Sequence, residues 1–390
     1  MTPRNRACIV GIADTALEKG RVPGGATVMQ IQARAARDAL AEAGLGMDDV
    51  DGLLVAGSWG MPRPGSMSAL AMAEYLNLQP RYLDNTNAGG SSFEMHVGHA
   101  AMALEAGACE VALILYGSDQ RSGGGRSLGG RPNWFDLQFE TPWGMPAPVG
   151  AYALAARRHM HEFGTTAEQL AEVAVATRQW ARLNSAAMMR EPMSVADVLA
   201  SPMIADPLHL FDCCLVTDGG GAIVMTTAER ARDLAKRPVA VRGYGECATH
   251  LSIPEMPDLA RLTCAERAGA EAYRKAGMGP QDMDVVEIYD SFTITVLLSL
   301  EALGFCAPGE GGAFVANQRT APGGDFPMNT NGGGLSYAHP GMYGIFLLIE
   351  AVRQLRGECG DRQVVDAELA LVHGTGGTLS SGATVILSRE

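Results

Sequence analysis

The sequence repeats one pattern twice, and this repeat limits the folds open to the chain. In each copy a glycine-containing strand is followed by a helix that ends in glycine, an acidic turn and a short apolar strand. Such self-similarity indicates one supersecondary design used twice. The matching positions are Gly11 with Gly243, Gly44 with Gly277 and Asp51 with Asp284, at offsets of 232 or 233 residues.

The two copies also share a second helix and a closing strand. The second helix is predicted at residues 92–106 in the first copy and 342–356 in the second. The closing strands include residues 221–224 and 382–385. Apolar strands that alternate with helices through short loops predict an α/β fold, in which helices cover mixed, largely parallel sheets. We therefore divide the chain into two halves, residues 1–235 and 236–390.

The first half is longer because it carries an insertion at about residues 121–207. Glycine-rich stretches open this insertion, aromatic and methionine side chains follow, and a helical stretch covers about residues 150–184. A long insertion of this composition is typical of a lid that shapes an apolar pocket. The alternative is a segment that only makes contacts between subunits. The large apolar side chains are Trp134, Phe135, Phe139, Trp143 and Met145.

Composition excludes several classes of function. A chain of 390 residues is expected to form two core units. Its net charge of −13 argues against a nucleic-acid surface, which needs a basic face. No apolar run reaches the ~20 residues of a membrane span, and no signal-peptide pattern is evident, so we expect a cytoplasmic protein. The eight cysteines include no Cys-x-x-Cys pair, which predicts no metal site and thiols in a reducing compartment.

Three loops rich in acid–base groups and glycine occur in the last hundred residues. They cover residues 289–292, 331–341 and 373–377, and each borders an apolar run with the character of a strand. We expect the three loops to meet at one sheet edge, where glycine turns let backbone N–H groups approach a substrate. The candidate catalytic residues in these loops are Tyr289, Asp290, His339 and His373.

These motifs, in this order and spacing, resemble the thiolase superfamily. The most specific are Asn-Gly-Gly-Gly through His-Pro-Gly at residues 331–341 and Gly-Thr-Gly-Gly through Gly-Ala at 374–383. The resemblance covers essentially the whole chain and is strongest to the thiolase-like branch related to sterol-carrier-protein thiolases. The family implies a five-layered α-β-α-β-α fold, an acyl-CoA substrate and a tight homodimer. We expect residues 82–86 and 111–116 at the dimer interface.

The resemblance also identifies a missing group. A thiolase has its nucleophilic cysteine at the N-terminus of the buried helix of the first half, where the helix stabilises a thiolate. Here the corresponding turn, residues 89–92, is Gly-Gly-Ser-Ser, and the nucleophile position falls within one residue of Gly90. Ser91 or Ser92 could replace the nucleophile. The alternative is that these serines cap the helix.

Other family positions carry over residue by residue. The residue that opens the family's Asn-Glu-Ala-Phe-like loop matches Tyr289, the loop histidine matches His339, and the second, acid–base cysteine falls at His373. The resemblance therefore implies a site that retains one family histidine, gains a tyrosine and lacks both cysteines. Tyr289 has an alternative role, since its ring could simply cover the end of the sheet.

This set of residues favours a retro-aldol reaction over a thiolytic one. Thiolytic cleavage needs a nucleophile that accepts an acyl group. Retro-aldol cleavage of a β-hydroxyacyl-CoA needs only a base, an oxyanion site and a proton donor. We expect the substrate to be bound by Gly89, Gly90, Ser91, Tyr337, Tyr343, Gly376 and Gly377.

The chain is similar to a subgroup of this branch, the steroid side-chain aldolases. These enzymes work with a small partner that carries a zinc ribbon and an OB fold, so the resemblance implies such a partner here. The subgroup is expected to have tyrosine at both key loop positions, whereas this chain has Tyr289 and His339. No permanently bound cofactor is expected, because CoA enters as part of the substrate thioester.

The sequence leaves two other functions open. The chain could be an acetyl-CoA acetyltransferase or thiolase whose nucleophile lies elsewhere, and covalent labelling by an acyl-CoA would favour that function. It could also be a non-catalytic scaffold that binds acyl-CoA. Tyr289, His339 and His373 argue against a scaffold, because a silent site has no need of three titratable groups beside glycine loops.

Overall fold

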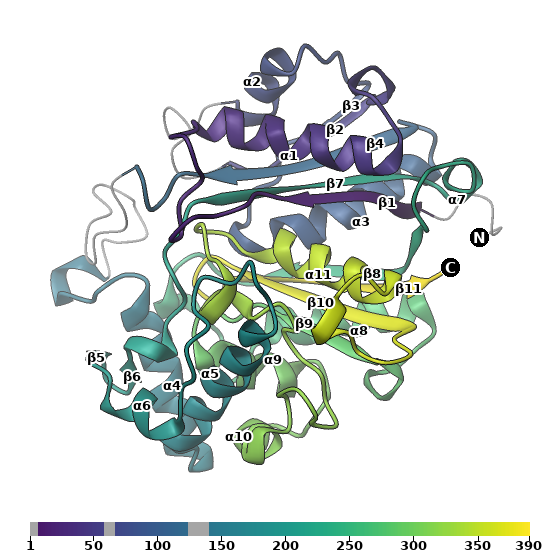
Figure 1. The fold of residues 1–390 in the computed structure, drawn as a ribbon. Helices are drawn as coiled ribbons and strands as arrows, with labels where there is room; N and C mark the ends of the chain where they lie inside the picture. Colours follow the sequence, from purple (N-terminus) through teal and green to yellow (C-terminus); the bar gives the residue numbers. More distant parts are fainter. Residues whose placement is uncertain (1–6, 58–66, 124–139) are drawn as a thin grey trace.

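The computed structural model describes residues 7–57, 67–123 and 140–390, and these form five layers (Figure 1). Helix α1 (Val28–Ala43) covers the outer face of the first half's strands, and α8 (Thr263–Ala276) covers the outer face of the second half's strands. Between them, α3 (Ser92–Glu105) and α11 (Gly344–Arg356) contact strands of both halves and each other. This is the α-β-α-β-α arrangement that the family resemblance implied.

The strands form one continuous mixed sheet of nine members, in the order β3-β2-β4-β7-β1-β8-β11-β10-β9. The two halves join where β1 pairs with β8, through Cys8 opposite Ala240 and Ile9 opposite Val239. A separate pair, β5 (Met203–Ala205) and β6 (Leu208–His209), lies in the insertion. The nine strands are β1 (Ala7–Asp14), β2 (Gly52–Val55), β3 (Tyr82–Asp84), β4 (Val111–Ser118), β7 (Gly219–Thr227), β8 (Val239–Ala248), β9 (Val285–Ile288), β10 (Leu369–Gly376) and β11 (Ser381–Arg389).

The sheet is mixed, as predicted, but the prediction that it is largely parallel was wrong. Among the described strands of this sheet, the parallel pairs are β2 with β3, β2 with β4 and β9 with β10. The central pairings, including β1 with β7 and β8 with β11, are antiparallel. The physical reason is clearest at β10 and β11, where the intervening residues 377–380 allow a hairpin but are too few for the crossover that parallel strands need.

The structure explains why glycine recurs at the repeated positions. Gly44 and Gly277 end α1 and α8 in the left-handed conformation, with φ of 76° and 68°, which glycine adopts without strain. Gly11 and Gly243 lie where each strand approaches its covering helix. A Cβ at either position would lie 3.0 Å from the Cβ of Ala43 or Ala276 respectively. The repeat therefore records two identical close contacts between strand and helix.

The insertion packs as a helical layer against the second half. The helical stretch predicted at 150–184 is divided into α4 (Val149–Phe163) and α5 (Ala167–Arg182), because Gly164 ends one helix at a φ of 73° and Thr166 caps the next. Helix α5 contacts α9 (Thr293–Ala302) and α10 (Gly311–Val315). Trp134, Phe135 and Phe139 lie outside the described residues. The remaining helices are α2 (Ser68–Tyr75), α6 (Val195–Ala200) and α7 (Ala228–Ala231).

Helix length and hydropathy bear on the membrane prediction. Among the described residues, no helix combines the length and the apolar character needed to cross a bilayer. This agrees with the sequence, in which no apolar run reaches ~20 residues.

Of the two segments predicted at a dimer interface, the structure leaves one accessible and buries the other. Strand β3 is an end strand of the sheet, and its residue Leu83 is 38% exposed. Strand β4 lies between β2 and β7 and is wholly buried, so residues 111–116 cannot form an interface. That part of the prediction was wrong, because the periodicity of an apolar run does not reveal its place within a sheet.

We predict that the protein is a homodimer that pairs through β3, with upward of ~2,000 Å² buried as in other obligate dimers. Light scattering at micromolar concentration should give twice the chain mass, and Leu83→Glu should shift the protein towards monomer. Val365→Glu, an equally apolar-to-charged change at an 82% exposed residue of the second half, should leave the dimer intact. A wild-type protein that is monomeric at these concentrations would contradict the prediction.

Candidate active site

The centre of the candidate site is a hydrogen-bonded pair of side chains, Tyr289 and His339. Tyr289 directly follows β9, and its hydroxyl oxygen lies 2.8 Å from Nε2 of His339. The two rings meet edge to face, with centroids 5.7 Å apart and an interplanar angle of 85°. Tyr289 is 4% exposed and His339 is 2% exposed. The structure thus joins two of the predicted catalytic residues in one buried acid–base pair.

Asp290 positions the loop that carries His339. Its carboxylate accepts hydrogen bonds from the backbone N–H of Gly334 at 2.6 Å and of Leu335 at 3.1 Å. Gly333 has a φ of 60°, and a Cβ there would lie 2.8 Å from Cγ of Asp290. Burial raises the pKa of Asp290 to about 6, although the two amide donors oppose that shift. Asp290 is therefore a positioning residue rather than an acid or base facing a substrate.

Two further residues fix the backbone around His339, and sequence analysis missed both. Thr217 accepts a hydrogen bond from the His339 N–H at its hydroxyl, at 3.0 Å, and donates its own N–H to the His339 carbonyl, at 3.2 Å. The hydroxyl of Tyr116 donates to the Pro340 carbonyl and accepts from the Met342 N–H. Both contacts cross more than a hundred residues of sequence, and no local pattern marks them.

The ring of Tyr289 occupies the space beside Gly90, where the family resemblance places the nucleophile. A Cβ added at Gly90 would overlap Cε2 of Tyr289 and would lie 2.6 Å from the carbonyl oxygen of Thr375. Neighbouring Gly89 has a φ of 78°, and a Cβ there would lie 2.5 Å from the backbone nitrogen of Gly377. A cysteine side chain has no room at residue 89 or residue 90.

The glycine turn at residues 89–90 is therefore in contact with residues 376–377, which belong to the third predicted loop. A Cβ at Gly376 would overlap the Ala88 carbonyl and lie 2.6 Å from Oγ of Ser381. The N-terminal turn of a buried helix and a glycine loop from the other half meet beside Tyr289. Backbone N–H groups in such a place are suited to stabilise negative charge.

The serines of the same turn have structural roles. Oγ of Ser91 lies 2.8 Å from Oγ of Ser381, and Ser91 is fully buried. Oγ of Ser92 accepts from the Ala88 N–H at 2.9 Å and donates to the Gly89 carbonyl at 2.6 Å. Both hydroxyls thus stabilise the turn that precedes α3, but Ser91 at the N-cap makes no side-chain cap hydrogen bond, so the predicted capping role is not confirmed.

The two predicted tyrosines of the His339 loop have different surroundings. The Tyr343 ring meets Tyr289 edge to face at 5.9 Å and stacks on His339 at 6.2 Å, and its hydroxyl donates to Oδ1 of Asn331 at 2.8 Å. Burial raises the pKa of Tyr343 well above the usual value. Tyr343 therefore belongs to the site as part of its aromatic wall.

Tyr337 does not share that role, so its assignment to substrate binding was wrong. Its hydroxyl donates to the carboxylate of Asp14, which is also bound by Arg353 at 2.6 Å. The pKa of the Tyr337 hydroxyl is raised well above the usual value by burial and by Asp14. The Asp14–Arg353 ion pair joins the end of β1 to α11, and the Tyr337 hydroxyl supplies the additional hydrogen bond that a buried ion pair needs.

His373 was predicted to join the acid–base group, and the structure contradicts this. Along a strand, neighbouring side chains point to opposite faces. Gly374 faces the central helices, so the ring of His373 points outwards, where Nδ1 lies 2.9 Å from Oγ1 of Thr384. A Cβ at Gly382 would lie 3.1 Å both from Cε1 of His373 and from the Ala265 nitrogen at the start of α8. Burial lowers the pKa of His373 to about 3, which is typical of a neutral core histidine.

Sequence analysis also missed Glu94, the second buried acid near this site. Glu94 lies in the first turn of α3, is 1% exposed, and its carboxylate oxygens have no hydrogen-bond partner from another described residue. A glutamate between Phe93 and Met95, near the start of a helix expected to be buried, was the available signal, since buried carboxyl groups are rare.

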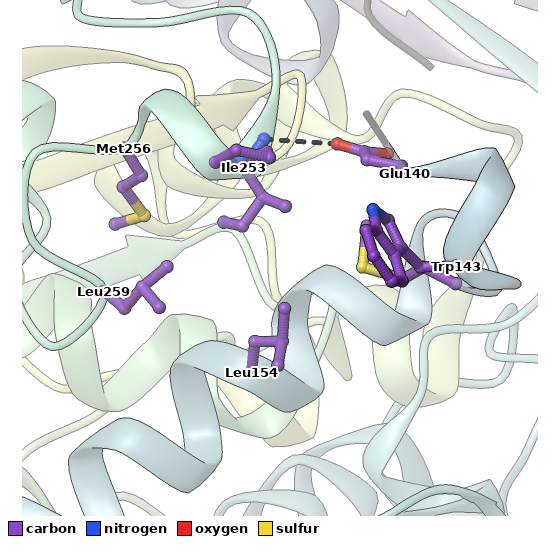
Figure 2. A pocket seen from close by; sticks show the side chains of 8 residues that line it. Glu140, Trp143, Leu154, Ile253, Met256 and Leu259 are labelled. Atoms are coloured by element: carbon purple, nitrogen blue, oxygen red, sulfur yellow. Dashed lines mark hydrogen bonds between the residues drawn. The ribbon is translucent and has the colours of Figure 1, made fainter. Parts of the chain in front are cut away.

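An apolar cavity of about 350 Å³ lies between the insertion and residues 253–259 (Figure 2). Helix α4 connects this region to the site, because the Tyr152 ring packs on Phe292 with centroids 4.3 Å apart and its hydroxyl donates to the Gly377 carbonyl at 3.4 Å. The insertion therefore contributes to an apolar pocket, as its composition predicted. The cavity is lined by Glu140, Trp143, Met145, Leu154, Ile253, Pro254, Met256 and Leu259.

A protein metal site needs several ligating side chains close together. In the part of the chain that the structure describes, no three His, Cys, Asp or Glu side chains are grouped so that they could hold a metal ion. The sequence had predicted no metal from its cysteine spacing.

Comparison with known proteins agrees with this geometry. Residues 245–389 match the family model described as thiolase C-terminal domain-like. The 17-hydroxy-3-oxo-4-pregnene-20-carboxyl-CoA lyase of Mycobacterium tuberculosis is 35% identical over 97% of this chain and 98% of that protein. The steroid side-chain-cleaving aldolase of Thermomonospora curvata is 33% identical over 95% of each chain.

Solved structures give the same family. The Ltp2–ChsH2(DUF35) aldolase superposes with a TM-score of 0.88 at 31% identity, covering 100% of this chain and 99% of that chain. Among the relatives found by sequence, an acetyl-CoA acetyltransferase of Methanothermobacter thermautotrophicus is 39% identical, over 65% of this chain and 66% of that protein. The chain belongs to the thiolase superfamily, in the branch that contains thiolase-like aldolases and lyases.

We predict that Gly90→Ala destabilises the protein and abolishes turnover, because its methyl group would overlap the Tyr289 ring. Overpacking of a filled site typically costs about 1–3 kcal/mol. Denaturant unfolding would measure the loss. Gly46→Ala is the matched control, since a Cβ there meets only Oδ2 of Asp49 at 3.9 Å. Equal stability of the two variants would contradict the close packing of Tyr289 on Gly90.

We predict that Tyr289→Phe and His339→Ala each lower turnover by about 10²–10⁴-fold, as expected for general acid–base groups, while both variants stay folded. Steady-state kinetics with circular dichroism would measure this. His373→Gln should retain turnover in the folded protein, because the ring faces away from the site. Unchanged turnover in Tyr289→Phe or His339→Ala would remove that residue from the catalytic pair.

Proposed function

We propose that this chain is an acyl-CoA carbon–carbon lyase that cleaves a β-hydroxyacyl-CoA by a retro-aldol reaction. The observation that carries the proposal is the Tyr289 ring packed on Gly90, which removes the nucleophile and puts an acid–base group in its place. Without a nucleophile no acyl-enzyme can form, whereas a retro-aldol step needs none.

The geometry supports a definite division of labour. The Tyr289–His339 pair takes the proton of the 3-hydroxyl group, with the 2.8 Å hydrogen bond as the path between the two side chains. The Cα–Cβ bond then breaks, and its electron pair moves towards the thioester as an enolate. The backbone N–H groups of the 89–90 and 376–377 turns stabilise the enolate oxygen. Protonation of Cα completes the shorter acyl-CoA.

The substrate class follows from the relatives and from the apolar cavity. The two full-length relatives act, by name, on a pregnene-derived CoA thioester and on a steroid side chain. A cavity of about 350 Å³ lined mostly by apolar side chains suits a large apolar acyl group. We extend the steroid-type substrate to this chain. CoA enters and leaves as part of a thioester, and no other cofactor is required.

An acyltransferase is the second candidate, and one relative favours it. The acetyl-CoA acetyltransferase of M. thermautotrophicus shares 39% identity over 255 residues. Such an enzyme would need a thiol near the site. Cys214 is half-buried, and its backbone N–H donates to the Ser291 carbonyl at 3.0 Å. Burial raises the pKa of Cys264 to about 12, so that thiol is poorly suited to attack at neutral pH.

We predict that a β-hydroxyacyl-CoA is converted into a carbonyl compound and a shorter acyl-CoA in equal amounts, without free CoA. Liquid chromatography with mass detection would measure both products. Cys214→Ser should retain turnover, and an acyl-CoA should add no mass to the intact protein. A strict need for free CoA, with a β-ketoacyl-CoA as the cleaved substrate, would decide for the acyltransferase.

We also predict a partner protein with a DUF35 domain, carrying an OB fold and a zinc ribbon. The solved aldolase that resembles this chain is, by name, an assembly of Ltp2 with ChsH2(DUF35). Co-expression of this chain with such a protein should give co-elution on size exclusion and higher turnover than the chain alone. Separate elution with full activity of the isolated chain would contradict the partner.

A further inference from the structure

Glu94 is a buried carboxyl group that the proposed chemistry has not yet used. It lies in the first turn of α3, close to Gly90, because a Cβ added at Gly344 would overlap the Gly90 carbonyl oxygen and lie 2.5 Å from Oε2 of Glu94. Neither of its oxygens has a hydrogen-bond partner from another described residue, although the side chain is 1% exposed. Burying a carboxyl group without partners costs free energy, which needs a compensating role.

Two glycines from the second half make room for this carboxyl group. A Cβ at Gly374 would lie 2.5 Å from Cδ and 2.9 Å from Oε1 of Glu94. A Cβ at Gly344, the first residue of α11, would lie 2.5 Å from Oε2 and 2.7 Å from Oε1. Any side chain at either position would displace the carboxyl group. Two glycines of the second half therefore leave the space that the Glu94 carboxyl group of the first half occupies.

The same contacts place Glu94 beside Tyr289. Strand β10 pairs with β9 in parallel, and His373 lies opposite Ile288. The next residues along the two strands, Gly374 and Tyr289, therefore lie side by side. Adjacent strands lie ~4.8 Å apart. The Glu94 carboxyl group covers Gly374, and the Tyr289 ring covers Gly90. The acid and the Tyr289–His339 pair thus line neighbouring parts of one site.

Glu94 is a neutral acid near pH 7. Burial raises its pKa to about 8, and no charged neighbour contributes to that shift. A neutral carboxyl group can donate a proton, which an ionised one cannot. After cleavage the Tyr289–His339 pair holds the hydroxyl proton, and the Glu94 carboxyl group, which lies against Gly374, offers a second proton donor.

We propose that Glu94 is the catalytic acid that protonates Cα of the acyl-CoA enolate. This inference rests on the proposed retro-aldol function. The hydroxyl proton moves to the Tyr289–His339 pair, the Cα–Cβ electrons form the enolate, and the Glu94 O–H proton is transferred to Cα. Glu94 is left as a carboxylate and the pair holds one extra proton. Transfer of that proton to Glu94, through solvent after product release, restores the enzyme with no net change.

The test is hydrogen exchange at Cα of the product. The wild-type protein, incubated with the shorter acyl-CoA in D₂O, should exchange the Cα hydrogens for deuterium, because the acid also removes them in reverse. Glu94→Gln should lose this exchange by about 10²-fold or more, and Glu94→Asp should restore part of it. Tyr289→Phe should still exchange while failing to cleave the hydroxyacyl-CoA. Mass detection of deuterium incorporation gives the rates.

A matched control separates catalysis from folding. Glu301 on α9 is also a buried carboxyl group, bound by the Gly311 N–H at 2.8 Å and by Nε2 of His159 at 3.0 Å. Glu301→Gln should exchange like the wild type. Glu94→Gln should melt close to the wild-type temperature, because an amide replaces an uncharged acid of the same shape. A folded Glu94→Gln protein that exchanges at the wild-type rate would overturn the inference.

Failure of this inference differs from failure of the proposed function. If the wild type cleaves the β-hydroxyacyl-CoA while Glu94→Gln cleaves and exchanges normally, the lyase function stands and the role of Glu94 is wrong. If the wild type exchanges Cα deuterium in a Glu94-dependent way but cleaves no β-hydroxyacyl-CoA, Glu94 is an acid for another reaction of acyl-CoA enolates, and the proposed lyase function is wrong. A wild type that cleaves without exchange overturns the role of Glu94.

Discussion

The contact between the Tyr289 ring and Gly90 is the constraint on which the site depends. It joins a helix N-terminus of the first half to a strand end of the second, and it leaves no room for a side chain at residue 90. The turn that would otherwise carry a nucleophile becomes a surface against which a phenol is packed. The remaining groups of the site are arranged around this contact: His339 on the phenol, Tyr343 beside it and Glu94 in the first turn of α3.

The loop that carries His339 is held by a series of hydrogen bonds rather than by packing alone. Asp290 binds its glycine-rich first part, Thr217 binds the His339 backbone, and Tyr116 binds the next turn. Each anchor comes from a different strand region of the sheet. A histidine held at both ends of its loop has few alternative positions, and this preorganisation allows a single 2.8 Å hydrogen bond to be maintained without substrate.

The sequence predicted the layered fold well, because the repeat reflects local contacts. Gly11 and Gly243 mark close strand–helix approaches, and Gly44 and Gly277 mark helix ends, so their spacing carries the architecture. Whether neighbouring strands pair in parallel or antiparallel was harder to predict from the sequence, since it depends on which strands become neighbours in the sheet. The sequence could assign Tyr289 and His339 to the same site, because the family motifs identify the loop positions that these residues occupy. His373 could not, because a shift of one residue along a strand reverses the face.

Glu94, Thr217 and Tyr337 show a second limit of sequence reasoning. Their roles depend on partners that are distant in the chain: Gly374 for the first, His339 for the second and Asp14 for the third. A glutamate near the start of a helix expected to be buried is visible in the sequence, but its free oxygens result from two glycines about 250 and 280 residues away. Such information exists only in the assembled molecule.

The division of the site between halves has a practical consequence at the segment that links them. Residues 232–238, between α7 and β8, are exposed or half-buried and lie outside the sheet. The β1–β8 pairing and the Asp14–Arg353 ion pair would still connect the halves if this segment were opened. Because Gly90 and Glu94 belong to one half and Tyr289 and His339 to the other, neither fragment alone has a complete site. Two separately produced fragments would therefore form a complementation pair, in which recovered turnover directly counts reassembled molecules.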